Sequence, residues 1–280
     1  MPTFTSSQPI AVSIDLQIGD ARIAASERAD TVVHVLPRDP ADEADVRAAQ
    51  ATEVDFSAGR LVVRGPRQRA LLFRRAGAVD VTIDLPNDSS VEGRAEVGTI
   101  RTSGRLGRCR VRAGVGDVDL DHAAELTAQI GAGAITVEHV SGRAEISTGV
   151  GSIRVGGIDG SAKLRNSNGD SWIGTVGGDL QARAANGEIA VRSAGANVAA
   201  TTANGALRIG GLARGKAELK TGNGQIDIGV RAGTAARLDV FTRFGQVDNR
   251  MEPTDGPGGA DGTVVVLART ASGDILVHRD

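Results

Sequence analysis

The sequence predicts an all-β fold: a single-stranded β-solenoid, or roll-like β-helix, with about 18 residues and two short strands in each coil. Three observations predict it. Aromatic residues make up only 2% of the 280 residues, which suits a thin core of small aliphatic side chains. Glycine, with 38 residues, is about twice as frequent as usual. Ten glycines recur at nearly fixed spacing, each followed two residues later by an every-other-residue pair that is usually aliphatic: Gly98, Gly116, Gly133, Gly151, Gly169, Gly187, Gly205, Gly224, Gly245 and Gly273. Such a period indicates one supersecondary unit stacked on copies of itself.

Residues 1–90 are predicted to form an N-terminal β region that caps the solenoid. Apolar and polar residues alternate through 9–36, and shorter alternating runs follow at 54–56, 61–63 and 79–85, as is typical of strands. Residues 37–52 break this pattern, because two prolines precede a stretch of good helix formers. One short helix is therefore expected near residues 40–51.

The regular repeats are predicted to occupy residues 91–249. After Gly187, Ile189 and Val191 are expected to point inward, and a second short strand follows with Val198 and Ala200 inward. An antiparallel meander of Asn-Gly hairpins has the same period and stays open as an alternative. It is disfavoured because the array would then be one sheet of roughly 18 short strands, whereas open sheets rarely exceed ~10.

Residues 250–280 are predicted to be a Pro/Gly-rich loop, at 250–262, followed by two strands. The open end of a solenoid is a bare sheet edge, which invites association with other edges. The two C-terminal strands are therefore expected to cap that end.

An asparagine precedes four successive repeat glycines, which predicts a ladder along one corner. Because Asn and Gly both tolerate positive φ, this corner is expected to need left-handed backbone. The asparagines would stack roughly 4.8 Å apart and hydrogen-bond along the axis. The residues of this expected turn ladder are Asn168, Asn186, Asn204 and Asn223 with Gly169, Gly187, Gly205 and Gly224.

No residue is assigned a catalytic, cofactor-binding or metal-binding role, and no cofactor is expected. A net charge of −2 and a pI of about 6.1 argue against nucleic-acid binding. The single cysteine, Cys109, excludes an intramolecular disulfide and is expected in the core.

Two polar clusters resemble metal-binding sites in part, and both are interpreted as solvated surface. His122 and His139 fall at equivalent places in adjacent coils, where a weak metal site with the neighbouring carboxylates is conceivable. Asp117, Asp119 and Asp121 share the outer face of one strand but lack the remaining ligands of a calcium loop.

Four outward residues are candidates for contact with a partner: Trp172, Arg154, Arg165 and Arg183. An outward tryptophan either anchors a partner or packs under a loop of its own chain, and both alternatives stay open for Trp172. The three arginines form, with Lys163 and Arg208, a loose basic patch on the middle coils. Glu145 and Glu218 interrupt it, so the area is interpreted as a mixed, solvated surface.

The repeated Asn-Gly-x-φ-x-φ pattern resembles the bacterial β-strand-repeat family DUF4097, labelled "putative adhesin". The residues that carry the resemblance are 168–173, 186–191, 204–209 and 223–228, and the opening strands are similar to those of actinobacterial members. The resemblance implies a β-solenoid without an assigned enzymatic activity, and it supplies no catalytic residues.

The sequence favours a non-enzymatic scaffold or protein-binding module with an unknown protein partner. Open alternatives are a self-assembling structural element that associates through the solenoid ends, an exported adhesin, and a β-helix enzyme of the lyase or acyltransferase type. No basic, apolar leader pattern starts the chain, and no apolar run reaches the ~18 residues of a membrane span. The expected location is the cytoplasm.

Overall fold

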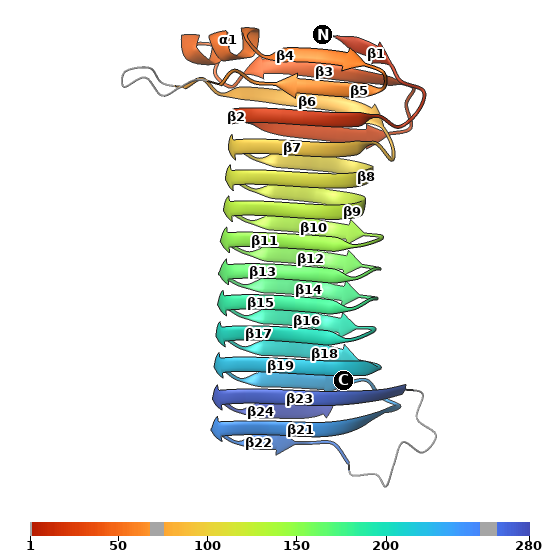
Figure 1. Ribbon diagram of the computed structural model, residues 1–280, viewed down its shortest axis with the longest axis vertical. Coiled ribbons are helices and arrows are strands. Elements are labelled where there is room, and N and C mark those ends of the chain that lie inside the picture. Colours follow the sequence, from red (N-terminus) through yellow and green to blue (C-terminus); the bar gives the residue numbers. More distant parts are fainter. Residues whose placement is uncertain (1, 68–75, 253–261) are drawn as a thin grey trace. The chain divides into compact units, whose positions relative to one another are not determined.

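The computed structural model describes residues 2–67, 76–252 and 262–280, which are almost entirely β-strands with one short helix (Figure 1). The chain divides into two compact units, Met1–His139 and Val140–Asp280. In both units, strands pair in parallel with strands of neighbouring coils, which is the predicted β-solenoid.

The first unit contains the helix and the longest strands. Its elements are β1 (Thr3–Thr5), β2 (Ala11–Ser26), β3 (Asp30–Pro37), α1 (Glu43–Gln50), β4 (Glu53–Ser57), β5 (Arg60–Arg64), β6 (Val79–Pro86), β7 (Ser90–Val97), β8 (Ile100–Val115), β9 (Val118–Ala132) and β10 (Ile135–Val140), whose last residue begins the second unit.

Strand β2 forms an interior coil of the first unit. Its first half pairs in parallel with β5 on one side and β7 on the other, and its second half pairs in parallel with β6 and β8. β2 therefore runs through a corner and serves both sheets, as β8 does. The predicted N-terminal cap thus begins with a strand that is itself part of the stack.

Antiparallel strands and the helix cover the coil made by β5 and β6. β4 pairs antiparallel with β5, β3 with β6, and β1 with β3. The helix begins where Asp42 accepts a hydrogen bond from the Ala44 N–H at 2.7 Å, and it lies within the predicted range. Buried Asp45 joins the helix to the coil by accepting from the Ala78 N–H at 2.7 Å.

The second unit is a regular series of short strands. These are β11 (Ala144–Val150), β12 (Ile153–Ile158), β13 (Ala162–Asn168), β14 (Ser171–Val176), β15 (Leu180–Asn186), β16 (Ile189–Ala194), β17 (Val198–Asn204), β18 (Leu207–Leu212), β19 (Gly215–Asn223), β20 (Ile226–Val230), β21 (Thr234–Phe244), β22 (Val247–Asn249), β23 (Gly262–Ser272) and β24 (Ile275–Arg279).

From β11 to β18, each strand pairs with the strand two places further along the chain, so the repeating unit is a coil and not a hairpin. β13 pairs with β11 and β15, and β14 with β12 and β16, always in parallel (Figure 1). The antiparallel-meander alternative is therefore wrong for this unit. Ile189, Val191, Val198 and Ala200 point inward and are buried, as the alternation predicts.

The C-terminal strands do not cap the second unit, which corrects the prediction. β23 lies between β19 and β21, and β24 lies between β20 and β22, with parallel pairing on both sides. The strand pair β21–β22, earlier in sequence, forms the outermost coil. Val264, Val266, Ala268, Ile275 and Val277 are wholly buried, so the chain places its more apolar strand pair in the interior of the stack. Most of the predicted loop at 250–262 lies outside the described residues.

Candidate functional site

The predicted corner ladder is present in the second unit. Asn186 Nδ2 donates to Asn168 Oδ1 at 2.8 Å, Asn204 to Asn186 at 2.9 Å and Asn223 to Asn204 at 2.8 Å. The following glycines, and not the asparagines, carry the positive φ. A Cβ on Gly187 would lie 2.1 Å from the Gly169 carbonyl oxygen of the preceding coil. The ladder therefore stacks the corners and needs glycine there for both conformation and space.

A second ladder, which the sequence analysis missed, runs inside the same corner. Thr202, Thr221 and Thr270 donate from their hydroxyls to the carbonyls of the repeat glycines, at 3.3 Å to Gly187, 2.9 Å to Gly205 and 3.0 Å to Gly224. The sequence does carry a signal for this ladder, because a threonine recurs at a position of the repeat where alternation predicts an inward, apolar side chain.

Asn166 takes the threonine's place in one coil. Its Nδ2 donates to the carbonyls of Gly151 at 2.9 Å and Gly169 at 2.8 Å, while its buried Oδ1 has no hydrogen-bond partner among the described residues. Ser171, the inward serine of the next strand, lies 3.5 Å from the same Nδ2. This polar pair stabilises a corner and is closed to a ligand.

The three aspartates of β9 and the preceding turn form hydrogen bonds or ion pairs within the first unit. Asp117 Oδ1 accepts from the Ala134 N–H at 2.8 Å, and Asp119 forms an ion pair with Arg101 at 3.1 Å. Asp121 accepts from the Gly104 N–H at 2.9 Å and also contacts His122 Nδ1 at 2.6 Å.

His122 and His139 do lie close together, with ring centroids 5.7 Å apart. Within residues 2–67, 76–252 and 262–280, no group of three or more His, Cys, Asp or Glu residues is arranged to hold a metal ion.

Cys109 is a core residue of the first unit. Its side chain is fully buried between the inward residues of β7 and β9, Val91 and Leu126. Burial raises the pKa of the thiol to about 12, because the thiolate would be desolvated. At neutral pH the group is a protonated thiol, and it packs as a small apolar side chain.

The outward side chains of the second unit form two surfaces that face opposite ways. We call the outward side of β11, β13, β15, β17 and β19 the front face, and that of β12, β14, β16, β18 and β20 the back face (Figure 1). The inward residues of the two sheets pack against each other, so their outward residues point in opposite directions.

The four predicted partner-contact residues divide between these faces. Arg165 on β13 is directly beside Arg183 on β15, on the front face. Arg154 on β12 is directly beside Trp172 on β14, on the back face, where the indole is 41% exposed. The single basic patch that joined Arg154 and Arg208 to Arg165 and Arg183 is therefore wrong, because the two strands of a coil belong to different sheets.

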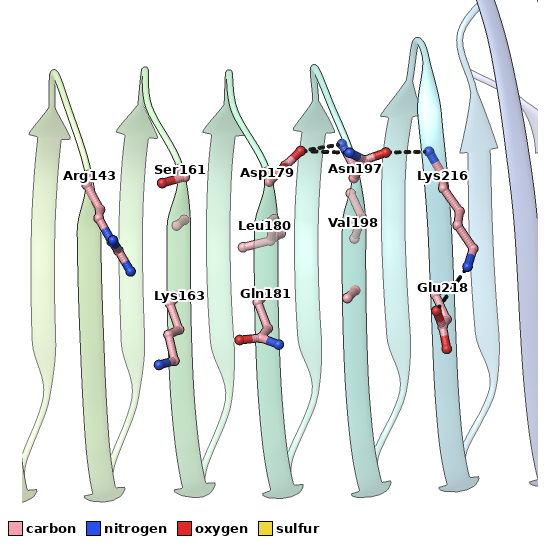
Figure 2. Close-up of a pocket in the computed structure, with 12 residues that line it drawn as sticks. Arg143, Ser161, Lys163, Asp179, Leu180, Gln181, Asn197, Val198, Lys216 and Glu218 are labelled. Carbon is pink, nitrogen blue, oxygen red and sulfur yellow. Dashed lines mark hydrogen bonds and ion pairs between the residues drawn. The ribbon is translucent and has the colours of Figure 1, made fainter.

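A groove of about 530 Å³ crosses the front face near the beginnings of its strands (Figure 2). Asp179 accepts from Asn197 Nδ2 at 2.9 Å, and Asn197 Oδ1 accepts from the Lys216 N–H at 2.9 Å, which ties successive coils together along one side of the groove. Glu218 forms ion pairs with Lys220 at 2.7 Å and Lys216 at 3.3 Å. Hydrogen bonds from these two lysines lower the pKa of Glu218, so the carboxylate stays ionised.

Arg143 lines this groove, and Arg165 and Arg183 lie two residues beyond its lining residues Lys163 and Gln181 on β13 and β15. Lys163 pairs with Glu145 at 3.3 Å, but Arg143, Arg165 and Arg183 form no ion pair or side-chain hydrogen bond with other described residues, and all three are exposed. Basic side chains therefore outnumber acidic ones across the front face: Arg143, Lys163, Arg165, Arg183, Lys216 and Lys220, against Glu145, Asp179 and Glu218. The face offers positive charge that the protein itself does not neutralise.

The described helix, α1, is too short and too polar to cross a membrane.

Among solved structures, the chain is similar to a "putative cell adhesion protein" from Clostridium sporogenes ATCC 15579, with 10% identity, 100% of this chain and 98% of that chain covered, and a TM-score of 0.24. It is similar to a "putative adhesin" from Bacteroides fragilis NCTC 9343, with 10% identity, coverage of 99% and 95%, and a TM-score of 0.29. It is also similar to a "putative lipid binding protein" from Parabacteroides distasonis ATCC 8503, with 10% identity, coverage of 99% and 96%, and a TM-score of 0.37.

No curated protein matches the sequence. A family model described as Toastrack DUF4097 matches residues 11–280, in agreement with the resemblance in the Asn-Gly repeats and with the parallel coils of both units. The chain belongs to the Toastrack family DUF4097.

Proposed function

We propose that this protein is a non-enzymatic β-solenoid scaffold that binds an acidic, extended segment of a partner protein on the front face of its second unit. The observation that carries the proposal is the adjacent pair Arg165 and Arg183. Both are exposed, form no ion pair among the described residues, and follow the groove-lining Lys163 and Gln181 on the outward side of β13 and β15. A rigid stack of parallel strands holds such side chains at fixed spacing, so the arginines need little ordering when a partner binds.

The charge and spacing of the face suit carboxylates. Neighbouring strands lie about 4.8 Å apart, so Arg165 and Arg183 present two guanidinium groups at that interval. Each guanidinium donates a fork of hydrogen bonds that matches a carboxylate. Along the same rank of positions, Arg183 is followed by Thr201 on β17 and Lys220 on β19, so an acidic segment lying across the strands would meet the two arginines first and Lys220 two strands further on.

The state of the acidic residues supports a binding role over an enzymatic one. A lyase-type site would need free carboxylates beside basic groups, but Asp117 and Asp119 are held by a backbone N–H and by Arg101. On the front face, Glu218 is held between two lysines and Asp179 by Asn197. These carboxylates therefore stabilise the surface, and Arg165 and Arg183 are the groups that bind the partner.

The test is affinity capture from a lysate of the source organism with three tagged versions of the full chain. These are the wild type, the front-face variant Arg165→Glu/Arg183→Glu, and a matched back-face variant, Arg154→Glu/Arg192→Glu. We expect one stoichiometric partner with the wild type and the back-face variant, and its loss with the front-face variant or at high salt. Equal capture by all three, or loss only with the back-face variant, would refute the front-face assignment.

A further inference from the structure

The outermost coil of the second unit, β21–β22, has an open edge. Among the described residues, β21 pairs with β23 and β22 with β24, and neither strand has a partner on its other side. Phe241 is 57% exposed, Phe244 66% and Val247 43%. The coil thus combines unpaired backbone groups with large exposed apolar side chains, a combination that soluble proteins normally cover.

In the first unit, the strand edges at the outermost coil are covered. There, antiparallel strands β3 and β4 close the edges of β6 and β5, and helix α1 packs beside them. Nothing equivalent covers β21 among residues 140–252 and 262–280. An uncovered edge of this kind is suited to pairing with another strand.

We propose that the β21 edge binds the β21 edge of a second copy of this chain, antiparallel about a two-fold axis at Phe241. In this register Asp239 lies opposite Arg243 of the second copy, Arg243 lies opposite its Asp239, and the two Phe241 rings meet. All three residues project from the same outward side of β21, as alternation along the strand requires. Opposite charges and paired aromatics across antiparallel strands stabilise a sheet.

The charges also select this register over its neighbours. The outward residues of both copies lie on the same face of the joined sheet only if the two-fold axis passes through a residue and not between two residues. Alternative registers therefore differ by moving the axis a whole number of residues along β21. An axis at Val240 sets Arg237 against Arg243, and an axis at Asp239 sets that carboxylate against its own copy. The register at Phe241 avoids both repulsions. Unlike an axis at Thr242, which sets Asp239 against Gly245, it also pairs opposite charges, because the pattern Asp-x-Phe-x-Arg around Phe241 is self-complementary.

The groups available at this edge fit the pairing. Arg243 makes no ion pair among the described residues, and its guanidinium lies over the Phe244 ring at 5.2 Å. Asp239 already pairs with Arg269 of β23, whose Nη2 donates to its two carboxylate oxygens at 2.9 and 2.8 Å, and those oxygens keep lone pairs that can accept from a second guanidinium. Because the interface is isologous, it closes at two copies and does not grow into a filament.

The first experiment measures molar mass by sedimentation across a wide concentration range. We expect a dimer for the full-length wild type. Arg243→Glu should raise the dimer dissociation constant about tenfold or more, because both symmetric pairs become repulsive. Arg237→Glu is the matched control, since Arg237 lies on the same side of the same strand but opposite Gly245 of the second copy. It should not raise the dissociation constant, because the new carboxylate lies diagonally from Arg243 of the second copy and attracts it.

The second experiment fixes the register with a disulfide. Opposed Cα atoms in antiparallel strands lie about 4.5–5.5 Å apart, within disulfide range, so Phe241→Cys should form a covalent dimer under mild oxidation. Two cysteines introduced by Arg237→Cys would be about 27 Å apart and should stay reduced. The native Cys109 does not interfere, because it is fully buried.

Three outcomes would overturn the proposal. These are a monomer at every concentration, equal cross-linking of the two cysteine variants, and a mass that grows beyond two copies. The front-face binding experiment is independent of all three, because it uses residues of β13 and β15.

Discussion

Replacing Gly187 with alanine tests the reasoning about the corner ladder most directly. Gly187 has φ of +129°, and an added Cβ would lie 2.1 Å from the Gly169 carbonyl oxygen. The disfavoured backbone conformation costs about 1–3 kcal/mol. Relieving the contact requires the two coils to separate by roughly 1 Å, since ordinary contacts begin near 3.4 Å.

That separation breaks bonds between neighbouring coils. The Gly169 N–H to Asn186 carbonyl bond, at 2.9 Å, and the Asn186–Asn168 side-chain bond, at 2.8 Å, both cross the affected corner. At about 0.5–1.5 kcal/mol each, their loss adds to the conformational cost. The expected destabilisation is about 2–6 kcal/mol in total, whose upper part is exceptional for a point substitution.

The matched control is Gly59→Ala, which separates conformation from crowding. Gly59 has φ of +73° and no heavy atom within 4 Å of its would-be Cβ, so only the left-handed conformation is penalised, by about 1–2 kcal/mol. The assay is urea unfolding. Trp172, the single tryptophan, reports on β14, which pairs with the strand after Gly187, and circular dichroism reports on the whole chain. If Gly187→Ala costs no more than Gly59→Ala, the crowding argument is wrong.

Three further predictions concern a core amide, the cysteine and acid stability. Asn166→Thr should change the stability of the second unit by less than about 1 kcal/mol in urea unfolding, because removing the unpartnered Oδ1 offsets the lost bond to the Gly169 carbonyl while the hydroxyl still donates to the Gly151 carbonyl; a loss of more than about 2 kcal/mol would contradict this. Cys109 should resist thiol reagents in the native protein at pH 8 and react on unfolding, because burial raises its pKa to about 12; rapid native labelling would show otherwise. Asp88 has a lowered pKa because Arg105 hydrogen-bonds to it, so its stabilising contribution is present above its ordinary pKa and is lost as pH falls through the lowered one. The stability difference between wild type and Asp88→Asn should therefore be constant above about pH 5 and shrink below about pH 4, and a difference that persists at pH 2 would refute it.

The architecture was predictable because it repeats. Each coil of the array carries its own glycine corner and its own inward pairs, such as Ile189 with Val191, so one pattern is stated many times. The Asn ladder was predictable for the same reason, since Asn186 and Asn204 recur at the spacing of one coil and must stack once the coils do. The helix at 43–50 was predictable from local composition alone.

The candidate site was only partly predictable. The sequence shows that Arg154, Arg165 and Arg183 point outward, but whether they share a surface depends on which sheet each strand joins. The free state of Arg165 and Arg183, compared with the ion-paired Lys163, depends on what the neighbouring coils place beside them. Contacts between coils, and not positions within a coil, decide these properties.

By itself, the sequence determined that the chain forms parallel coils of about 18 residues with a small aliphatic core, and where the corners fall. Only the tertiary structure decided the order in which the terminal coils stack. β2 and β23 each pair with strands on both sides, although they lie near the two ends of the chain. All the coils share one inward pattern and a nearly common register, so local sequence permits almost any coil to lie beside any other. The choice is made by the burial of the whole stack, which places wholly buried Val264 and Val266 in the interior and leaves the more polar β21 at the open edge.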